Sequence, residues 1–480
     1  MRLAQLKIRD APGPLLPSLK QLRVIEPNES SISQLSLFFT KSLQSLEATG
    51  VPEAQQSAFL SFLITLVDEA PLLSTITIGP GSFTASCLNA CLKFDHLRKF
   101  ELTDAASSVN FDFLVAVGEL PELEIFILNA RTATYISPPL NHDGTPPRAP
   151  SPTPKLPATP QQCDSGPIDI QMQSGSPDRA ASVGRFARLR RLDIIGSLPL
   201  IRDLYERVIS VDLEWLGMTL VRTSAPAPAL QKGKKNKHYA NTAEVRKPAT
   251  TSSIDLETDS IFTLVENAVK EKWSLTLKGV RLGHLQDYHS KTRHPQGHMI
   301  YHDPDPIALP FTTFGVLLKH EILEDLDIAG WTLPRTETEC PVDEILQATL
   351  PNLKKIHLPV GGQTHGIQLA ELLPIVHAFP RLVSLQCGFE EPGIFPIPPT
   401  SAADVPLHGL KVLSVGHKNS PDSAIDQKQQ LRIANFLDIV FPNLERIETH
   451  AEHHAEVWAY IYELIKMCQA SRLYHANRFS

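Results

Sequence analysis

The chain has 480 residues, 42% hydrophobic and 20% charged, a balance typical of folded proteins rather than of disordered ones. Its net charge of -7 is small for this length, so the chain as a whole creates no field that draws it to nucleic acid or to an anionic membrane. The sequence has no apolar segment after Met1 and no run of 18 apolar residues, so we expect neither a secretory signal peptide nor a membrane span.

A six-residue motif recurs along the chain, with apolar residues at its first, fourth and sixth places. The copies are Leu19–Val24, Leu73–Ile78, Leu97–Leu102, Leu123–Leu128, Leu189–Ile194, Leu323–Ile328, Leu353–Leu358, Leu382–Cys387, Leu410–Val415 and Leu444–Thr449. A proline stands two residues before several copies, as at Pro17, Pro71 and Pro121, where it ends a preceding helix. This spacing is typical of the short strand of leucine-rich repeats and predicts a stacked array.

Segments with helical periodicity lie between the motifs. In the segment that contains Phe59, Phe62 and Leu66, apolar residues recur at intervals of three and four, as on one face of an amphipathic helix. Similar stripes occupy Phe111–Val117, Leu200–Val208, Ile261–Val269, Leu369–Phe379 and Leu431–Val440. Each unit is therefore predicted to be a helix, a turn, a short strand and a loop.

The repeat is irregular in length. Neighbouring motif centres lie 24 residues apart at Leu22 and Leu46 but 34 apart at Leu413 and Ile447. Leucine-rich repeats run about 20–29 residues, so these units lie at the long, helix-containing end of the range or beyond it.

Stretches rich in proline, serine, lysine or histidine interrupt the array. We expect N-terminal repeats over 1–136, a disordered Pro/Ser-rich insertion over 137–182, a repeat segment over 183–222, a basic flexible linker over 223–253, a degenerate repeat over 254–280 with its strand at Trp273–Leu277, a His-rich loop over 281–306, and C-terminal repeats with a terminal helix over 307–480. The predicted fold class is α/β, a curved and irregular leucine-rich-repeat solenoid of helix–short parallel strand units with disordered insertions.

Signatures of catalysis do not occur in the sequence. It contains no G-x-x-x-x-G-K-[ST] loop, no G-x-S-x-G elbow and no H-E-x-x-H zinc motif. The histidines at 450, 453 and 454 have the wrong spacing for a zinc helix, and those at 284, 289, 294, 298 and 302 show no regular ligand pattern. We expect no enzyme activity, no cofactor and no metal site.

The six cysteines include no C-x-x-C pair, and they are too sparse for a disulfide framework. Reduced thiols, together with the absence of a signal segment, predict a cytoplasmic location, a nuclear one, or both.

The densest group of positive charge lies in the predicted basic linker. Lys234, Lys235 and Lys237 fit a short basic nuclear-import pattern, although exposed linkers also carry lysines for solubility. Nucleic acid is not the expected partner, because no aromatic platform for stacking bases accompanies the lysines beyond Tyr239.

The strand motifs predict a binding surface. If the three apolar positions point into the core, strand alternation turns the residues on both sides of the central one outward, onto the concave face of the solenoid. These residues are Lys99, Glu101, Ile125, Ile127, Arg191, Asp193, Asp325, Asp327, Lys355, His357, Arg446 and Glu448. Their charges are mixed in sign. Ile125 and Ile127 are apolar where their neighbours are polar, so either the Pro/Ser-rich insertion covers them, which we favour, or they form a hot spot for a partner.

The motifs that follow long helices, with their Phe-Pro-x-Leu junctions at Phe379–Leu382 and Phe441–Leu444, resemble the repeat half of F-box/leucine-rich-repeat proteins of the fungal type. In that family an F-box helix bundle docks a ubiquitin-ligase scaffold and the repeats capture the substrate. Here a strand motif at Leu3–Ile8 begins almost at Met1, so we expect the ligase-docking bundle to be missing, either because the sequence is truncated or because the chain is a repeat-only relative. The resemblance implies a ligase scaffold as partner only where an F-box lies upstream.

We therefore expect a non-enzymatic protein-binding scaffold that resembles a substrate receptor. The alternative is a leucine-rich-repeat regulator of an enzyme, such as a GTPase-activating protein. That alternative needs an essential arginine or asparagine at the rim, and Arg191 alone does not establish one.

Overall fold

The computed structural model describes residues 16–27, 29–80, 83–103, 109–131, 185–222, 252–286, 292–293, 299–300, 308–328, 331–332, 345, 347–348, 350–359, 367–389, 408–417, 425–449 and 455–479. The predicted insertion at 137–182, the motif at Leu3–Ile8 and nearly all of the basic linker lie outside these residues.

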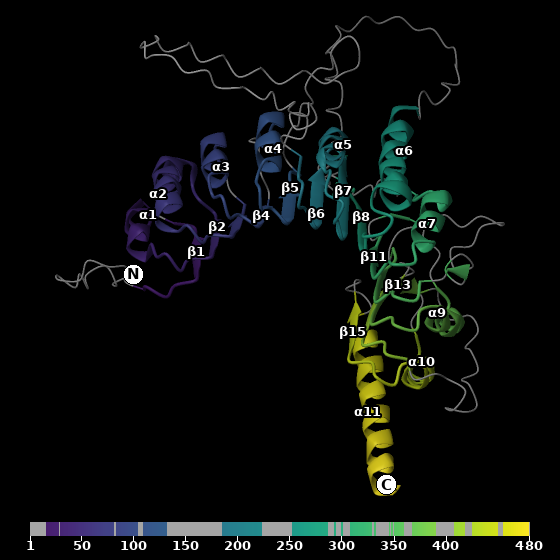
Figure 1. Cartoon of the computed structure of the whole chain (residues 1–480). Helices are drawn as coiled ribbons and strands as arrows, with labels where there is room; N and C mark the ends of the chain where they lie inside the picture. The colour runs from purple at the N-terminus through teal and green to yellow at the C-terminus, as the bar shows by residue number, and fades with distance from the viewer. Residues whose placement is uncertain are drawn as a thin grey trace, which may run out of the picture.

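One parallel sheet runs through the described chain from end to end, and neighbouring strands follow the order of the sequence (Figure 1). Its thirteen strands are β1 (Gln21–Ile25), β2 (Ser45–Thr49), β3 (Thr75–Ile78), β4 (Lys99–Leu102), β5 (Ile125–Asn129), β6 (Arg191–Gly196), β7 (Trp215–Arg222), β8 (Gly279–Gln286), β11 (Asp325–Asp327), β12 (Lys355–His357), β13 (Ser384–Phe389), β14 (Val412–His417) and β15 (Arg446–Thr449). A separate antiparallel pair joins β9 (Thr292–Arg293) and β10 (Met299–Ile300).

The helices lie along the outer side of this curved sheet, which leaves the strands to line the inner side (Figure 1). They are α1 (Glu29–Gln34), η2 (Leu35–Phe38), η3 (Glu53–Gln55), α2 (Gln56–Glu69), α3 (Ala85–Cys91), α4 (Phe111–Gly118), α5 (Leu198–Arg207), α6 (Ser252–Asn267), η5 (Ala268–Lys272), α7 (Phe311–Leu318), η6 (Leu369–Glu371), α9 (Leu372–Ala378) and α10 (Gln427–Val440). The last helix, α11 (Ala455–Phe479), lies at the C-terminal end of the sheet instead (Figure 1). The predicted curved α/β solenoid is confirmed.

The centres of the motifs form one continuous line through the core. In the register of the sheet, the following residues pair from strand to strand: Leu22, Leu46, Ile76, Phe100, Phe126, Leu192, Leu216, Val280, Leu326, Ile356, Leu385, Leu413 and Ile447. All except the first and last have no exposed surface. Each unit therefore completes its burial against its neighbours, which makes the array a leucine-rich-repeat solenoid.

The same pair of backbone hydrogen bonds lies at the start of each strand of the main sheet after β1 and joins it to the preceding unit. The carbonyl of Lys20 accepts hydrogen bonds from the amides of Gln44 (2.8 Å) and Ser45 (3.0 Å) in the next unit. The same pairing recurs across each strand-to-strand step and ends where the carbonyl of Lys411 accepts from Glu445 (2.8 Å) and Arg446 (3.0 Å). It keeps the register constant although the units differ in length.

The middle of the array differs from the sequence prediction. The strand predicted at Trp273–Leu277 is wrong: Trp273 is buried in the turn after η5, where its indole N–H donates to the Ser210 carbonyl at 2.8 Å. The strand is β8, so residues 281–286 belong to the sheet and not to the predicted His-rich loop. The helix α6 begins at Ser252 and takes the last two residues of the predicted basic linker.

The end of the array is closed by α11, which packs on α10 and β15. Trp458, Ile461 and Ile465 on its inner face are buried, with at most 3% of their surface exposed. The Gln469 amide donates to the carbonyls of Pro442 (3.3 Å) and Leu444 (3.1 Å), just before the last strand. This helix therefore covers the apolar end of the solenoid, as a capping repeat does.

Candidate protein-binding face

The predicted site residues fall in two parallel rows on the strands, one on each side of the buried central line. The first row includes Lys99, Ile125, Arg191, Asp325, Lys355 and Arg446, and the second includes Glu101, Ile127, Asp193, Asp327, His357 and Glu448. Most of them are partly or fully exposed, and Asp193 is the buried exception at 7%. Their placement follows from strand alternation, because the residues that flank an inward-pointing side chain point to the opposite face of the sheet.

Most of the predicted charges neutralise one another locally. The Lys99 ammonium lies 2.8 Å from the Glu101 carboxylate, and the Arg446 guanidinium lies 3.0 Å from the Glu448 carboxylate. On the neighbouring strands β11 and β12, Lys355 lies 3.6 Å from Asp325, and the His357 ring lies 3.7 Å from Asp327. In each pair at least one side chain is partly exposed, so the pairs add little stability and give the face a mixed polar character without a dominant sign.

Burial affects one of these carboxylates. It raises the pKa of Asp325 above its usual value, while the neighbouring Lys355 and His357 act in the opposite direction.

The structure adds two residues that the sequence reasoning missed. Trp215 on β7 lies in the first row, between Arg191 and Gly279, and Arg281 on β8 lies in the second row, between Gly217 and Asp327. The signal was present in the sequence, because Leu213–Met218 and Leu277–Leu282 both follow the apolar spacing of the motif. Glycines at 217 and 279 inside these two copies weakened the strand pattern.

Trp215 is the centre of an ordered polar network. Its indole N–H donates to one oxygen of the Asp193 carboxylate at 3.1 Å, and Arg191 Nε donates to the other oxygen at 2.8 Å. The Arg191 guanidinium also lies over the Trp215 ring, 4.9 Å from its centre. These contacts fix the orientation of the ring.

Arg281 extends this network to the next strand. Its Nε donates to Asp327 at 3.1 Å, and its guanidinium lies 5.8 Å from the centre of the Trp215 ring. The indole thus has an arginine on a strand at either side. We call Ile125, Ile127, Arg191, Asp193, Trp215, Arg281 and Asp327 the central concave patch.

Two glycines make room for these side chains. A Cβ atom on Gly279 would lie 2.0 Å from Cε3 of Trp215, and one on Gly217 would lie 1.8 Å from Oδ1 of Asp193. Real Cβ atoms never approach so closely, so the indole and the carboxylate lie directly against the backbone of the following strand. Gly217 and Gly279, which weaken the strand pattern of β7 and β8 in the sequence, are therefore required for the packing of the patch.

Ile125 and Ile127 lie beside this network, because the register pairs them with Arg191 and Asp193. Both are partly buried. The insertion that we expected to cover them lies outside the described residues, so that expectation stays a prediction.

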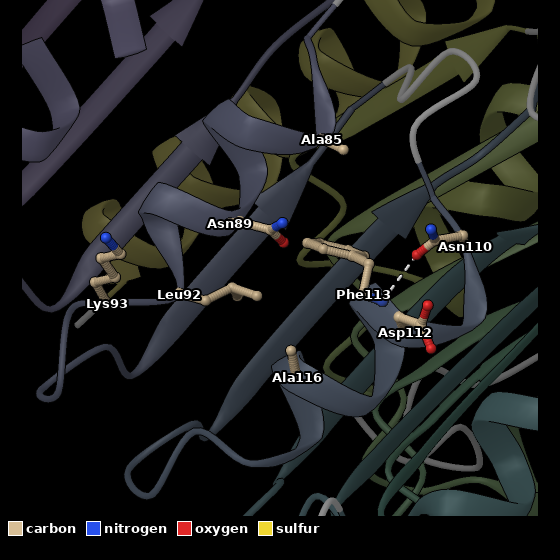
Figure 2. Close-up of a pocket in the computed structure, with 8 residues that line it drawn as sticks. All are labelled: Ala85, Asn89, Leu92, Lys93, Asn110, Asp112, Phe113 and Ala116. Atoms are coloured by element: carbon tan, nitrogen blue, oxygen red, sulfur yellow. Dashed lines mark hydrogen bonds between the residues drawn. The ribbon is translucent and has the colours of Figure 1, made fainter. Parts of the chain in front are cut away.

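The outer side of the solenoid has a separate hollow of about 480 Å³ between α3 and α4. Figure 2 shows the lining residues, which are Ala85, Asn89, Leu92, Lys93, Asn110, Asp112, Phe113 and Ala116. The side chain of Asn110 accepts the Phe113 amide at 2.9 Å and so caps α4. The lining shows no nucleophile–base pair, and we interpret the hollow as the space between two repeats.

No three His, Cys, Asp or Glu side chains in the described parts of the chain are grouped to hold a metal. Of the predicted His-rich group, His284 is buried on β8 against the Trp331 ring, 5.3 Å between centres, and the other four lie outside the described residues.

Cys87, Cys91 and Cys387 are buried, and burial raises the pKa of the last two thiols. The residues predicted to direct nuclear import, Lys234, Lys235 and Lys237, lie outside the described residues. Among the described helices none is both long and apolar enough to cross a bilayer.

Comparison with known proteins gives little beyond this description. No protein-family pattern matches the sequence, and no curated protein is significantly similar to it. Among solved structures, an internalin (InlF) from Listeria monocytogenes aligns with 92% of this chain and 85% of its own, at 12% identity and a TM-score of 0.29. The APL1 leucine-rich repeat domain aligns with 84% of this chain and 76% of its own, at 11% identity and a TM-score of 0.30. The repeat architecture is shown by the sheet, register and motif of the chain itself.

Proposed function

We propose that this chain is a non-enzymatic scaffold that binds another protein on its concave face, with Trp215 as the main anchor. The support for this proposal is the position and surroundings of Trp215: a partly exposed indole, held between two arginines near the middle of the inner face. Tryptophan and arginine are the residue types most enriched among side chains that dominate binding energy.

The chemistry of the central concave patch defines the kind of partner. Arg191 and Arg281 are balanced by Asp193 and Asp327, so the patch is neutral and does not select a strongly acidic or basic ligand. A protein surface that places an apolar side chain on the indole, with polar groups of both signs around it, fits these residues.

The finer role that we propose is that of a substrate receptor, as in F-box/leucine-rich-repeat adaptors. The support is the resemblance of the motif and its Phe-Pro-x-Leu junctions. The ligase scaffold enters this proposal only through an F-box upstream of Met1.

The GTPase-activating alternative is less well supported. It relies on a rim arginine, but Arg191 Nη2 lies 2.7 Å from the Asp193 carboxylate, and its guanidinium covers Trp215. An arginine held in this way is committed to positioning the indole.

The test is affinity capture from the source cell with the full chain, followed by quantitative identification of the captured proteins. The wild type is compared with Trp215→Ala and with Leu275→Ala, a control whose side chain is 88% exposed in the turn before β8. We expect a set of proteins that is lost with Trp215→Ala and retained with Leu275→Ala. Capture of a small GTPase whose hydrolysis the chain stimulates would contradict the receptor role, and equal capture by all three chains would contradict the concave site.

The location in the cell stays part of the proposal. We propose that Lys234, Lys235 and Lys237 direct nuclear import. A fluorescent fusion of the full chain that loses nuclear signal when all three are changed to alanine would support this, and an unchanged distribution would contradict it.

A further inference from the structure

The helix α11 has a second apolar face that nothing in the described structure covers. Tyr460, Met467 and Tyr474 are 49%, 68% and 63% exposed. They lie seven residues apart, which is close to two helical turns, so they form one stripe along the helix. The buried residues Trp458, Ile461 and Ile465 face the solenoid from the opposite side. The stripe therefore points away from the body.

The position of α11 leaves room for a partner. The helix extends from the last strand beyond the solenoid (Figure 1). Residues 470–475 are all exposed, and Arg472 is the one among them that bonds to the body, through Asp438 of α10, so the outer side of this part of the helix faces solvent. A stripe at heptad spacing on a projecting helix is the surface that a second helix uses in a coiled-coil pair.

The order of residues along the stripe is symmetric about Met467. Tyr460 lies seven residues before it and Tyr474 seven after it, while Glu456 lies eleven before and Arg478 eleven after. If two copies of the helix cross antiparallel with Met467 at the two-fold axis, Tyr460 of each copy faces Tyr474 of the other. Glu456 then faces Arg478.

Charge distinguishes the two possible directions. In a parallel pair Glu456 would meet Glu456 and Arg478 would meet Arg478, both of which are repulsive. In the antiparallel pair each acid meets a base, and the helix dipoles also oppose one another favourably. This self-complementarity indicates a second copy of the same chain rather than a different protein.

We propose that the chain self-associates through the outer face of α11, as an antiparallel two-fold helix pair centred on Met467. The interface consists of three large side chains per copy and two symmetric ion pairs. It is small, so we expect a weak dimer that dissociates on dilution.

Sedimentation equilibrium of the full chain, over a concentration series from micromolar to near-millimolar, tests this. The Met467→Glu variant places two carboxylates together on the axis and is expected to weaken association by about 100-fold or more. The matched control is Leu473→Glu, which changes a side chain of the same helix that is 65% exposed but lies off the stripe. The control should associate as the wild type does, and circular dichroism of both variants checks that the fold is intact.

A charge exchange tests the direction of pairing. Glu456→Arg or Arg478→Glu alone should weaken the dimer by about three-fold, because each places like charges opposite one another. The two changes together should restore wild-type association in an antiparallel pair. A monomer at all concentrations would overturn the proposal, as would equal effects of Met467→Glu and Leu473→Glu. Failure of the double variant to recover would overturn the antiparallel arrangement.

Discussion

At the scale of single residues, the concave face depends on the absence of side chains at two positions. Gly279 and Gly217 let the indole of Trp215 and the carboxylate of Asp193 lie against the next strand. The proposed binding surface is thus built from side chains that lean along the sheet and are fixed by hydrogen bonds within the chain. A rigid aromatic anchor binds with a smaller loss of conformational entropy than a mobile one.

The Gly279→Ala substitution tests this dependence. The new Cβ would meet Trp215 Cε3, so we expect the indole to be displaced, a loss of about 1–3 kcal/mol in the free energy of unfolding, and weaker partner binding. Chemical denaturation and a binding titration measure the two effects. The matched control is Gly409→Ala, because a Cβ at that position meets nothing within 4 Å. Similar losses for both variants would contradict the role given to Gly279.

Two buried histidines predict how stability depends on pH. His320 Nε2 lies 2.8 Å from the Leu277 carbonyl, and His408 Nε2 lies 2.9 Å from the Phe379 carbonyl, so each joins its own unit to the preceding one. Burial lowers the pKa of both imidazoles below the ordinary 6.5. The folded state therefore binds fewer protons than the unfolded state as the pH falls through 6.5, and stability must decrease in that direction.

The measurement is urea denaturation at a series of pH values for the wild type and for the double variant His320→Gln, His408→Gln. We expect the wild type to lose stability as the pH falls below about 6.5 and the variant to show a shallower dependence in that window. The carboxyls of Asp325 and Asp438 act in the opposite direction, since burial raises the pKa of both and folding is favoured as they are protonated. Their effect belongs to a lower window, above their ordinary 3.8. Identical profiles for the two proteins would contradict the assignment to the histidines.

At the scale of the elements, regular copies of the motif could be predicted from the sequence, but the middle of the array could not. Phe100 and Phe126 sit in strands with full alternation, and their units are as predicted. The strands β7 and β8 keep the apolar spacing of the motif, but each carries a glycine inside it, and β8 also follows a long gap, so the strand pattern is weakened at both. The structure establishes their register through the pairing of β7 with β6 and of β8 with β11.

The candidate site was predicted in part for the same reason. The rows that flank the central line follow from alternation, which is a local property of each strand. The association of Trp215 with Arg191 and Arg281 brings together side chains from three successive strands of the sheet, and no spacing within one motif encodes it. The outer stripe of α11 was also missed, although its seven-residue spacing is visible in the sequence.

The capping helix gives a prediction at this scale. Trp458 is 3% exposed and lies 5.7 Å from the Phe389 ring, between ring centres, so Trp458→Ala should cost about 3–5 kcal/mol. Because units contact mainly their neighbours, we expect the loss to be concentrated in the C-terminal repeats. Hydrogen exchange should show faster exchange in β14 and β15 and little change in β2 and β3. The exposed Leu473→Ala serves as control, and uniform loosening of the whole sheet would contradict the prediction.

At the scale of the whole molecule, the continuous central line and the paired backbone hydrogen bonds at the strand starts keep thirteen strands in one sheet although the repeats differ in length. The longest connections between neighbouring strands follow β5, β7 and β8, which carry Ile125, Trp215 and Arg281 of the central concave patch. The inner face stays continuous across these strands because their register is unbroken. If a partner binds the concave face and a second copy binds α11, the resulting dimer presents two binding faces to a multivalent partner.

The central claim is that a partner protein binds the concave face at Trp215. The most direct measurement is a calorimetric titration of the captured partner with the full wild-type chain, Trp215→Ala and Leu275→Ala. We predict that Kd rises by about ten-fold or more for Trp215→Ala, as expected for loss of an aromatic anchor, and stays unchanged for Leu275→Ala. Unchanged affinity in Trp215→Ala, with the fold intact by circular dichroism, would contradict the claim.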